Sequence, residues 1–148
     1  MPTRSTPKKR RRRSKVTVQR AVGAAPAAAL LRKYALAAAP PGAQVTLRVV
    51  GAAEGRFLNA TFRKRNYATN VLSFSYDRRN GDVVLCHPVI RKEARSWRRP
   101  LAAHYAHLVV HGILHLRGHD HLRRRDAARM ERAEIRILRR LGFPDPYG

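Results

Sequence analysis

Three histidines and a glycine constrain the fold of the last third of the chain. His111 and His115 stand four residues apart, and Gly118 precedes the third histidine, His121. Four residues turn a helix by roughly 400°, so the first two histidines share one helical face. A glycine can leave a helix in a left-handed conformation and return the chain toward that face. The pattern therefore predicts three imidazoles around one metal, with a fourth position open.

The spacing H-x-x-x-H-x-x-G-x-x-H is that of the metzincin proteases, with one difference. Those proteases carry Glu directly after the first His as their general base. This chain has Gly112 at that position. The missing base argues against peptide cleavage, and a metzincin-like metalloprotease remains only as an alternative.

Spacing alone leaves the third ligand open. His119 competes with His121, because it lies two residues earlier in the same turn, and His107 lies one helical turn before the pair. As a ligand, His107 would make the site closed and structural; otherwise it could line a pocket or relay protons. Asp120 is the nearest carboxylate and could accept the second N–H of a ligand.

Three neutral imidazoles suit Zn²⁺ best, although Ni, Cu or Co would also accept them. Four histidines recur along the expected helix at spacings of three, four and four: His104, His107, His111 and His115.

The charge of the chain points to a polyanionic partner. Lys and Arg number 32 against 9 Asp and Glu, which gives a net charge of +23. Such basicity is typical of proteins that bind nucleic acid or an anionic membrane surface. Residues 1–14 are expected to form a disordered basic tail, which could be a nucleic-acid arm, a nuclear signal or a solubilising segment. Residues 15–148 are expected to fold as one domain, which stays basic without the tail.

Neither a membrane segment nor an oxidising compartment is indicated. No apolar run is long enough to span a bilayer. The single cysteine, Cys86, excludes an intrachain disulfide. The basic start followed by apolar residues 21–31 imitates a signal peptide, but residues 16–22 alternate like a strand. We therefore expect a cytoplasmic protein with no membrane partner, and the sequence leaves its oligomeric state open.

Hydrophobic periodicity predicts four strands and five helices. The strands are expected at 16–22, 44–50, 69–76 and 82–86, and the helices at 26–38, 52–64, 88–97, 101–116 and 123–141. Asn80-Gly81 is a turn signal between the last two strands. Interleaved strands and helices in one small sheet predict a single domain, α+β or α/β in arrangement.

Residues 104–121 resemble the signature of the YbeY family, bacterial endoribonucleases that mature ribosomal RNA. Further stretches agree in order: 58–63, 68–74, 81–86, 93–94, 130–131 and 141–147. The resemblance covers roughly residues 16–148. It implies an α+β fold with a small mixed sheet, four-stranded here, and about five flanking helices.

The resemblance also implies a function. A member of this family would be a metal-dependent, single-strand-preferring endoribonuclease in rRNA processing and ribosome quality control, with rRNA and ribosomal particles as partners. The motif assigns one Zn²⁺ to His111, His115 and His121. The functional arginine of the family maps to Arg63, whose guanidinium could clamp a phosphate. We therefore take these three histidines and Arg63 as the catalytic residues.

Several features leave the mechanism open. The chain has His119 where the family usually has Tyr, and residues 64–67 (Lys-Arg-Asn-Tyr) replace the common Gly-Lys-Asp. The segment between Phe74 and Gly81 is short, and the basic tail is an addition. Attack by hydroxide and attack by the ribose 2′-OH are both possible, with His107, His119 and Asp120 as candidate proton carriers. The alternative of another class is a non-catalytic ribosome assembly factor with a structural zinc.

Overall fold

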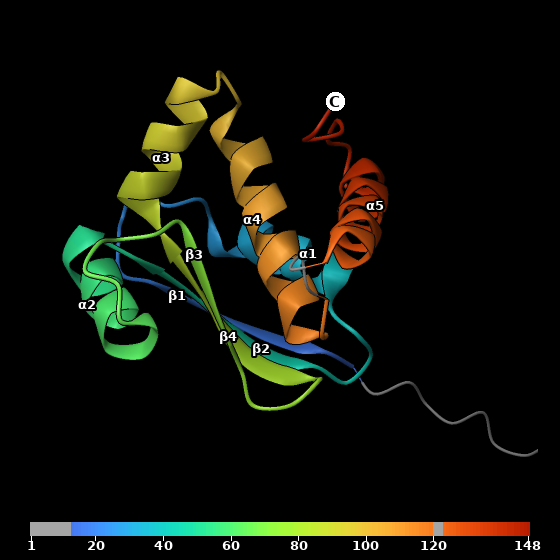
Figure 1. Ribbon diagram of the computed structural model, residues 1–148, viewed down its shortest axis with the longest axis horizontal. Helices are drawn as coiled ribbons and strands as arrows, with labels where there is room; N and C mark the ends of the chain where they lie inside the picture. Colours follow the sequence, from blue (N-terminus) through green and yellow to red (C-terminus); the bar gives the residue numbers. More distant parts are fainter. Residues whose placement is uncertain (1–12, 120–122) are drawn as a thin grey trace, which may run out of the picture.

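Strands and helices interleave along the chain in the computed structural model, which describes residues 13–119 and 123–148 (Figure 1). Within these residues there are four strands and five helices. In chain order they are β1 (Lys15–Arg20), α1 (Ala28–Ala38), β2 (Gln44–Val50), α2 (Ala52–Arg63), β3 (Val71–Ser75), β4 (Asn80–Cys86), α3 (His87–Ser96), α4 (Leu101–Leu116) and α5 (Arg124–Arg140). The predicted α+β single domain is confirmed, and its expected elements agree with these bounds to within about two residues.

The sheet is mixed, and its order places β3 at one edge. The strands follow one another as β1-β2-β4-β3, with β1, β2 and β4 parallel and β3 antiparallel to β4. Parallel neighbours require crossover connections, and α1 and α2 supply them. The outer edge of β3 consequently faces no other strand in the described part of the chain. It lies beside α4 instead (Figure 1).

The main core lies between the sheet and α4. Ten of the 16 residues of α4 are buried, and this helix packs on α1, α3, α5 and the strands β3 and β4. Alternate residues of β2 point into the same core, because side chains of a strand alternate between its two faces. A smaller cluster lies under α2 on the opposite face, formed by Val50, Leu72, Val84 and Cys86. The helices therefore cover both faces of the sheet, with α4 as the central one.

Two expectations about the chain ends and membranes can be compared with these residues. The predicted tail, 1–14, lies almost wholly outside the described residues. Among the helices that the structure describes, none combines the length and the apolar character that crossing a membrane demands.

The turn expected at Asn80-Gly81 is wrong. Residues 76–79 make the turn, and the Asp77 carboxylate accepts hydrogen bonds from the backbone N–H groups of Arg79 and Asn80. Strand β4 already begins at Asn80, and Gly81 pairs with neighbours on both sides of it. Gly81 therefore serves a different purpose from the one that the Asn-Gly pair suggests.

Close packing explains this glycine. A Cβ atom on Gly81 would lie 2.6 Å from Leu116 Cδ2 and 2.7 Å from the Phe74 carbonyl oxygen. Both distances are shorter than any normal contact between a carbon atom and an atom to which it is not bonded. The absent side chain lets the end of α4 approach the β3–β4 pair.

We predict that Gly81→Ala lowers the free energy of unfolding by about 1–3 kcal/mol, because overpacking forces neighbours to shift. Urea unfolding measures the change. Gly23→Ala is the control, since a Cβ there meets nothing within 4 Å, and its effect should stay within about 0.5 kcal/mol. Equal stability of the two variants would contradict the packing argument.

Candidate active site

The four histidines of α4 belong to two separate networks. His104 lies beside α3, where its Nε2 is 3.0 Å from Glu93 Oε1. Glu93 also accepts a 3.0 Å hydrogen bond from Asn70 Nδ2, at the start of β3. Burial lowers the pKa of His104 despite the neighbouring carboxylate. The histidine stripe expected from the sequence is therefore divided, because its N-terminal member contacts a different helix from the others.

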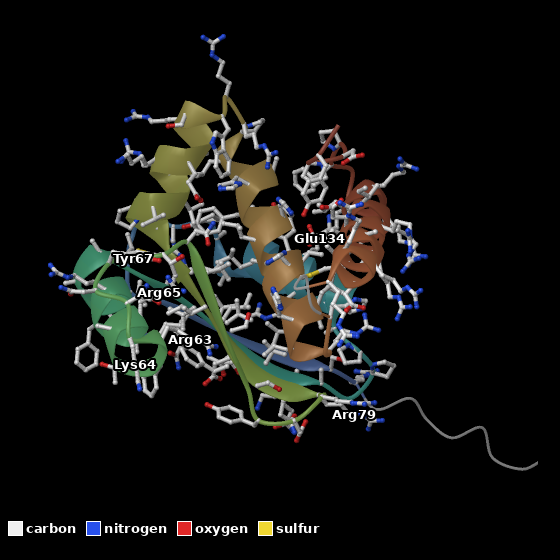
Figure 2. All side chains as sticks on the ribbon, in the orientation of Figure 1. Arg63, Lys64, Arg65, Tyr67, Arg79 and Glu134 are labelled. Carbon is white, nitrogen blue, oxygen red and sulfur yellow. The ribbon has the colours of Figure 1, made fainter. Side chains whose placement is uncertain are left out.

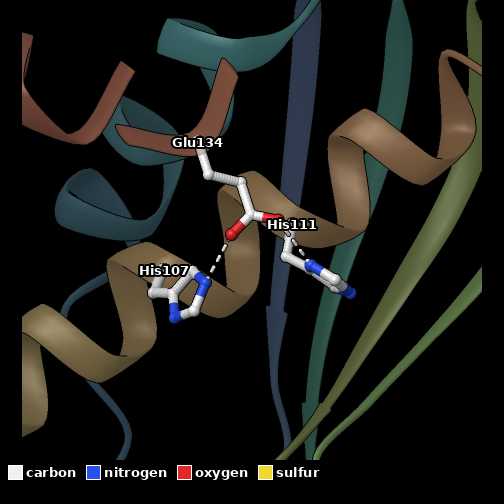
Figure 3. Close-up of side chains that lie close together, drawn as sticks. All are labelled: His107, His111 and Glu134. Carbon is white, nitrogen blue, oxygen red and sulfur yellow. Dashed lines mark hydrogen bonds and ion pairs between the residues drawn. The ribbon is translucent and has the colours of Figure 1, made fainter. Parts of the chain in front are cut away.

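Glu134 of α5 connects the next two histidines. Its two carboxylate oxygens lie 2.5 Å from His107 Nε2 and 2.8 Å from His111 Nδ1 (Figure 3). The Tyr147 hydroxyl donates a third hydrogen bond, at 2.6 Å. Only 1% of the Glu134 side chain is exposed. The carboxylate thus joins α4, α5 and the C-terminal segment inside the protein.

The ionisation of Glu134 fixes the proton on His111. Burial raises the pKa of this carboxyl, but hydrogen bonds from His107, His111 and Tyr147 outweigh burial and hold the pKa at about 2. A carboxylate only accepts hydrogen bonds, so the Nδ1 atom of His111 must carry its proton. In the neutral ring that carries its proton on Nδ1, the lone pair lies on Nε2, the atom through which this imidazole would bind a metal.

His111 and His115 are placed as two ligands of one metal would be. Their Nε2 atoms are 3.1 Å apart. Two nitrogens on a tetrahedral Zn²⁺ with Zn–N of about 2.0–2.1 Å would be about 3.3 Å apart. The residues present therefore fit a metal ion between these rings.

The predicted set of three histidine ligands stays a prediction. His111 and His115 lie together, whereas His121 and Asp120 fall outside the described residues. In the part of the chain that the structure describes, one group could hold a metal by proximity, namely His107, His111 and Glu134. Its ligand atoms lie within 4.8 Å of one another. The chain thus has a possible metal site at His111, whichever neighbours complete it.

His119 lies beyond the end of α4 in a basic hollow of about 420 Å³. Burial lowers its pKa, and Arg117 and Arg129 lower it further. The hollow is also lined by Gly118 and Asp126. Burial and the neighbouring arginines therefore disfavour the protonated form of His119.

Arg63 faces the same cleft as the two histidines. This cleft of about 700 Å³ runs between the edge of β3 and the C-terminal half of α4, and it is lined by Arg63, His111 and His115 among others. Arg63 ends α2, and its Nη2 donates a 2.7 Å hydrogen bond to the Ser73 carbonyl. Its guanidinium lies 5.3 Å from the centre of the Phe74 ring. Three residues singled out by the sequence therefore meet in one cleft.

Basic and aromatic side chains gather beside Arg63. Lys64 and Arg65 follow it directly, with Tyr67 two residues further on, and Figure 2 shows them beside α2, Lys64 toward its lower end and Tyr67 toward its upper end. All three side chains are exposed, as is Phe62 within α2. Cations interleaved with aromatic rings can bind a phosphate chain and stack on bases.

Gly112 has no space for the protease base. A Cβ atom there would lie 2.8 Å from Val83 Cγ1 and 3.2 Å from Ser73 Oγ. The position faces the sheet, and its carbonyl accepts a hydrogen bond from the Ser73 hydroxyl. A glutamate could not be accommodated without moving the helix away from β3 and β4.

The sequence patterns did not single out Glu134 as a functional residue, although its position in α5 could have indicated a role. The buried residues of α5 recur at helical spacing: Met130, Ala133, Glu134, Ile137 and Leu138. A carboxylate within such an apolar stripe needs a buried partner. The histidines of α4 provide the nearest candidates, but only the packing of the two helices identifies which.

A cleft with imidazoles oriented by a buried carboxylate, and with an arginine for an anionic group, is typical of hydrolases of phosphodiesters. The family model described as "Endoribonuclease YbeY" matches residues 8–142. The chain belongs to this family, and the prediction of an enzyme of this class is confirmed.

Individual relatives agree with this assignment. The chain is 52% identical over 140 residues to the endoribonuclease YbeY of Aromatoleum aromaticum, covering 89% of this chain and 91% of the relative. It is 52% identical over 121 residues to that of Nitrosomonas europaea, covering 80% and 74%. A solution structure of a Thermotoga maritima protein shares the fold, with a TM-score of 0.61 and 19% identity over 86% of this chain and 91% of that one.

Proposed function

We propose that this protein is a zinc-dependent endoribonuclease that cleaves single-stranded RNA in rRNA maturation and ribosome quality control, in the cytoplasm. The observation that supports it best is the shared cleft of Arg63, His111 and His115. Membership of the YbeY family supplies the reaction class. Ribosomal RNA and ribosomal particles are the proposed partners.

We assign the zinc to His111, His115 and His121. Spacing and the family motif carry the assignment of His121. The alternative set of His107, His111 and Glu134 is less suitable, because Glu134 is 1% exposed and already accepts hydrogen bonds at 2.5 and 2.8 Å. In our proposal, Glu134 orients His111 from behind, as carboxylates commonly do for zinc-bound histidines.

The metal and the arginine have complementary tasks. Zinc bound at this place would lower the pKa of a bound water and polarise a phosphate oxygen. Arg63 holds the anionic phosphate with its forked N–H groups, one of which is fixed on the Ser73 carbonyl. Stacking on Phe74 further restricts the guanidinium. Positive charge thus meets the substrate where negative charge develops during phosphodiester cleavage.

The surroundings of the cleft favour unpaired RNA. Phe62 and Tyr67 are 58% and 52% exposed and can stack on splayed bases. Lys64 and Arg65 lie between these two residues in the sequence, and their positive charges attract the phosphate backbone of the RNA. A base-paired helix would hide its base faces from these rings.

We predict that His115→Ala abolishes cleavage of a single-stranded RNA and that Arg63→Ala lowers kcat/KM by about 10²–10³-fold. Arg63→Lys should recover only part of the loss, since lysine lacks the fork. The control is Arg95→Ala, which removes an exposed arginine of α3.

All variants are purified in parallel, and the ends of the products are identified. A 2′,3′-cyclic phosphate would indicate attack by the ribose 2′-OH and exclude hydroxide as the sole nucleophile. Full activity of the Arg63→Ala or His115→Ala protein would refute the site. Intact RNA with zinc-loaded wild type would favour a non-catalytic assembly factor.

We further predict that Glu134→Gln weakens zinc binding about 10–100-fold without loss of the fold, because His111 loses the carboxylate that orients it. Competition with a chelating dye measures the affinity, and circular dichroism checks the fold. Glu131→Gln, on the exposed side of the same helix, should leave zinc affinity unchanged. Identical affinities for the two variants would exclude an orienting role for Glu134.

A further inference from the structure

Six arginines form a continuous stripe along the outer side of α5. We call them the arginine ridge: Arg125, Arg129, Arg132, Arg136, Arg139 and Arg140. Their spacing of four, three, four, three and one confines them to an arc of roughly 100° around the helix. All six are exposed, and Figure 2 shows nitrogen-bearing side chains pointing away from this side of α5.

The charges of the ridge are not paired with acidic side chains among residues 13–119 and 123–148. None of the ion pairs between described residues includes a ridge arginine. Asp126 and Glu131 are the other acidic residues of α5 besides the buried Glu134, and neither falls on the ridge arc. Like charges one turn apart destabilise a helix by about 0.2–0.5 kcal/mol per pair. Packing of its buried face keeps α5 helical despite this repulsion. The stability of the fold therefore does not explain why six arginines lie along one side of the helix.

The residue type indicates phosphate as the ligand. Residues 123–140 contain eight arginines and no lysine. The guanidinium fork binds a phosphate through two parallel hydrogen bonds, which an ammonium group cannot do. The ridge extends over about 22 Å, at 1.5 Å per residue. It can therefore follow several phosphates of one backbone.

Two hollows lie along the ridge. A shallow groove of about 650 Å³ is lined by Arg132, Ile135, Arg136, Arg139 and Arg140. Arg129 lines the basic hollow of His119, just past the end of α4 that carries His115. The ridge is thus continuous with the surface next to the cleft.

A base-paired partner fits this surface better than other polyanions. The ridge carries no aromatic side chain on which unpaired bases could stack. The half-buried apolar side chains beside the ridge, Ala128 and Ile135, are far less than a membrane-binding helix offers. Double-stranded RNA is bound mainly through its phosphates and shape.

We propose that the arginine ridge is a second RNA-binding surface, which holds the backbone of a double-stranded stem. The single-stranded continuation of the same RNA lies in the cleft with Arg63. This proposal rests on the proposed function, since it takes the substrate to be RNA. It makes the junction between stem and single strand the preferred place of cleavage.

The test uses Arg132→Gln, Arg136→Gln and Arg139→Gln together in the full chain, and none of these three arginines lines the cleft. The matched control removes three exposed cations of α3: Arg91→Gln, Lys92→Gln and Arg95→Gln. One RNA has a stem followed by a single strand, and the other is the same single strand alone. Binding is measured in a His115→Ala background over a range of salt, and cleavage in the active enzyme.

We expect the ridge variant to bind the stem RNA roughly 10- to 100-fold more weakly, with a salt slope reduced by about 3. Its cleavage of the single strand should stay within twofold of wild type. Equal losses in the α3 control, equal losses on the single strand, or unchanged stem binding would each overturn the ridge proposal. So would loss of binding to anionic phospholipid vesicles with stem binding intact. Because binding is measured in the inactive background, it tests the ridge even if wild type cleaves no RNA.

Discussion

The buried carboxylate of Glu134 is the interaction on which the site depends. Taking a carboxylate out of water costs several kcal/mol unless hydrogen bonds replace its hydration. Three donors do so here, from His107, His111 and Tyr147. The same bonds join α4, α5 and the C-terminal segment, and they decide which nitrogen of His111 keeps a proton. One group thus contributes to the docking of two helices and sets the protonated nitrogen of one imidazole.

The cleft exists because α4 can lie close against β3 and β4. Gly81 and Gly112 leave space at two points of this contact, where any Cβ would collide with Leu116 or with Val83. The Ser73 hydroxyl then reaches the Gly112 carbonyl, while the Ser73 carbonyl accepts from Arg63 on the other side. An edge strand such as β3 can form hydrogen bonds with both α4 and Arg63, because its outer side has no further strand to pair with. Segments far apart in sequence therefore meet along β3.

Local sequence patterns predicted the helices, the strands and the pair His111 and His115. They did not predict which helices and strands contact one another. The spacing of His111 and His115 is a property of one helix, so sequence sufficed. The partner of His111 is 23 residues away on α5, and its choice depends on how two helices dock. Asn80-Gly81 resembled a turn because glycine gives the same signal for a turn and for close approach. His104 lies on the same face of α4 as the other histidines. However, this face contacts α3 near His104 and α5 near His107 and His111.

Helix α5 has two faces with opposite electrostatic character, and both bear on the same substrate in our proposal. Its inner face carries the ionised Glu134 among apolar residues, where low dielectric strengthens the hydrogen bonds to the histidines. Its outer face carries the arginine ridge, where water and salt screen the mutual repulsion of the arginines. RNA bound to the outer face would neutralise that repulsion and so stabilise the helix that supports His111. In our proposal, a polyanionic substrate would therefore stabilise the helix that helps to form the site and would offset the repulsion among the six ridge arginines.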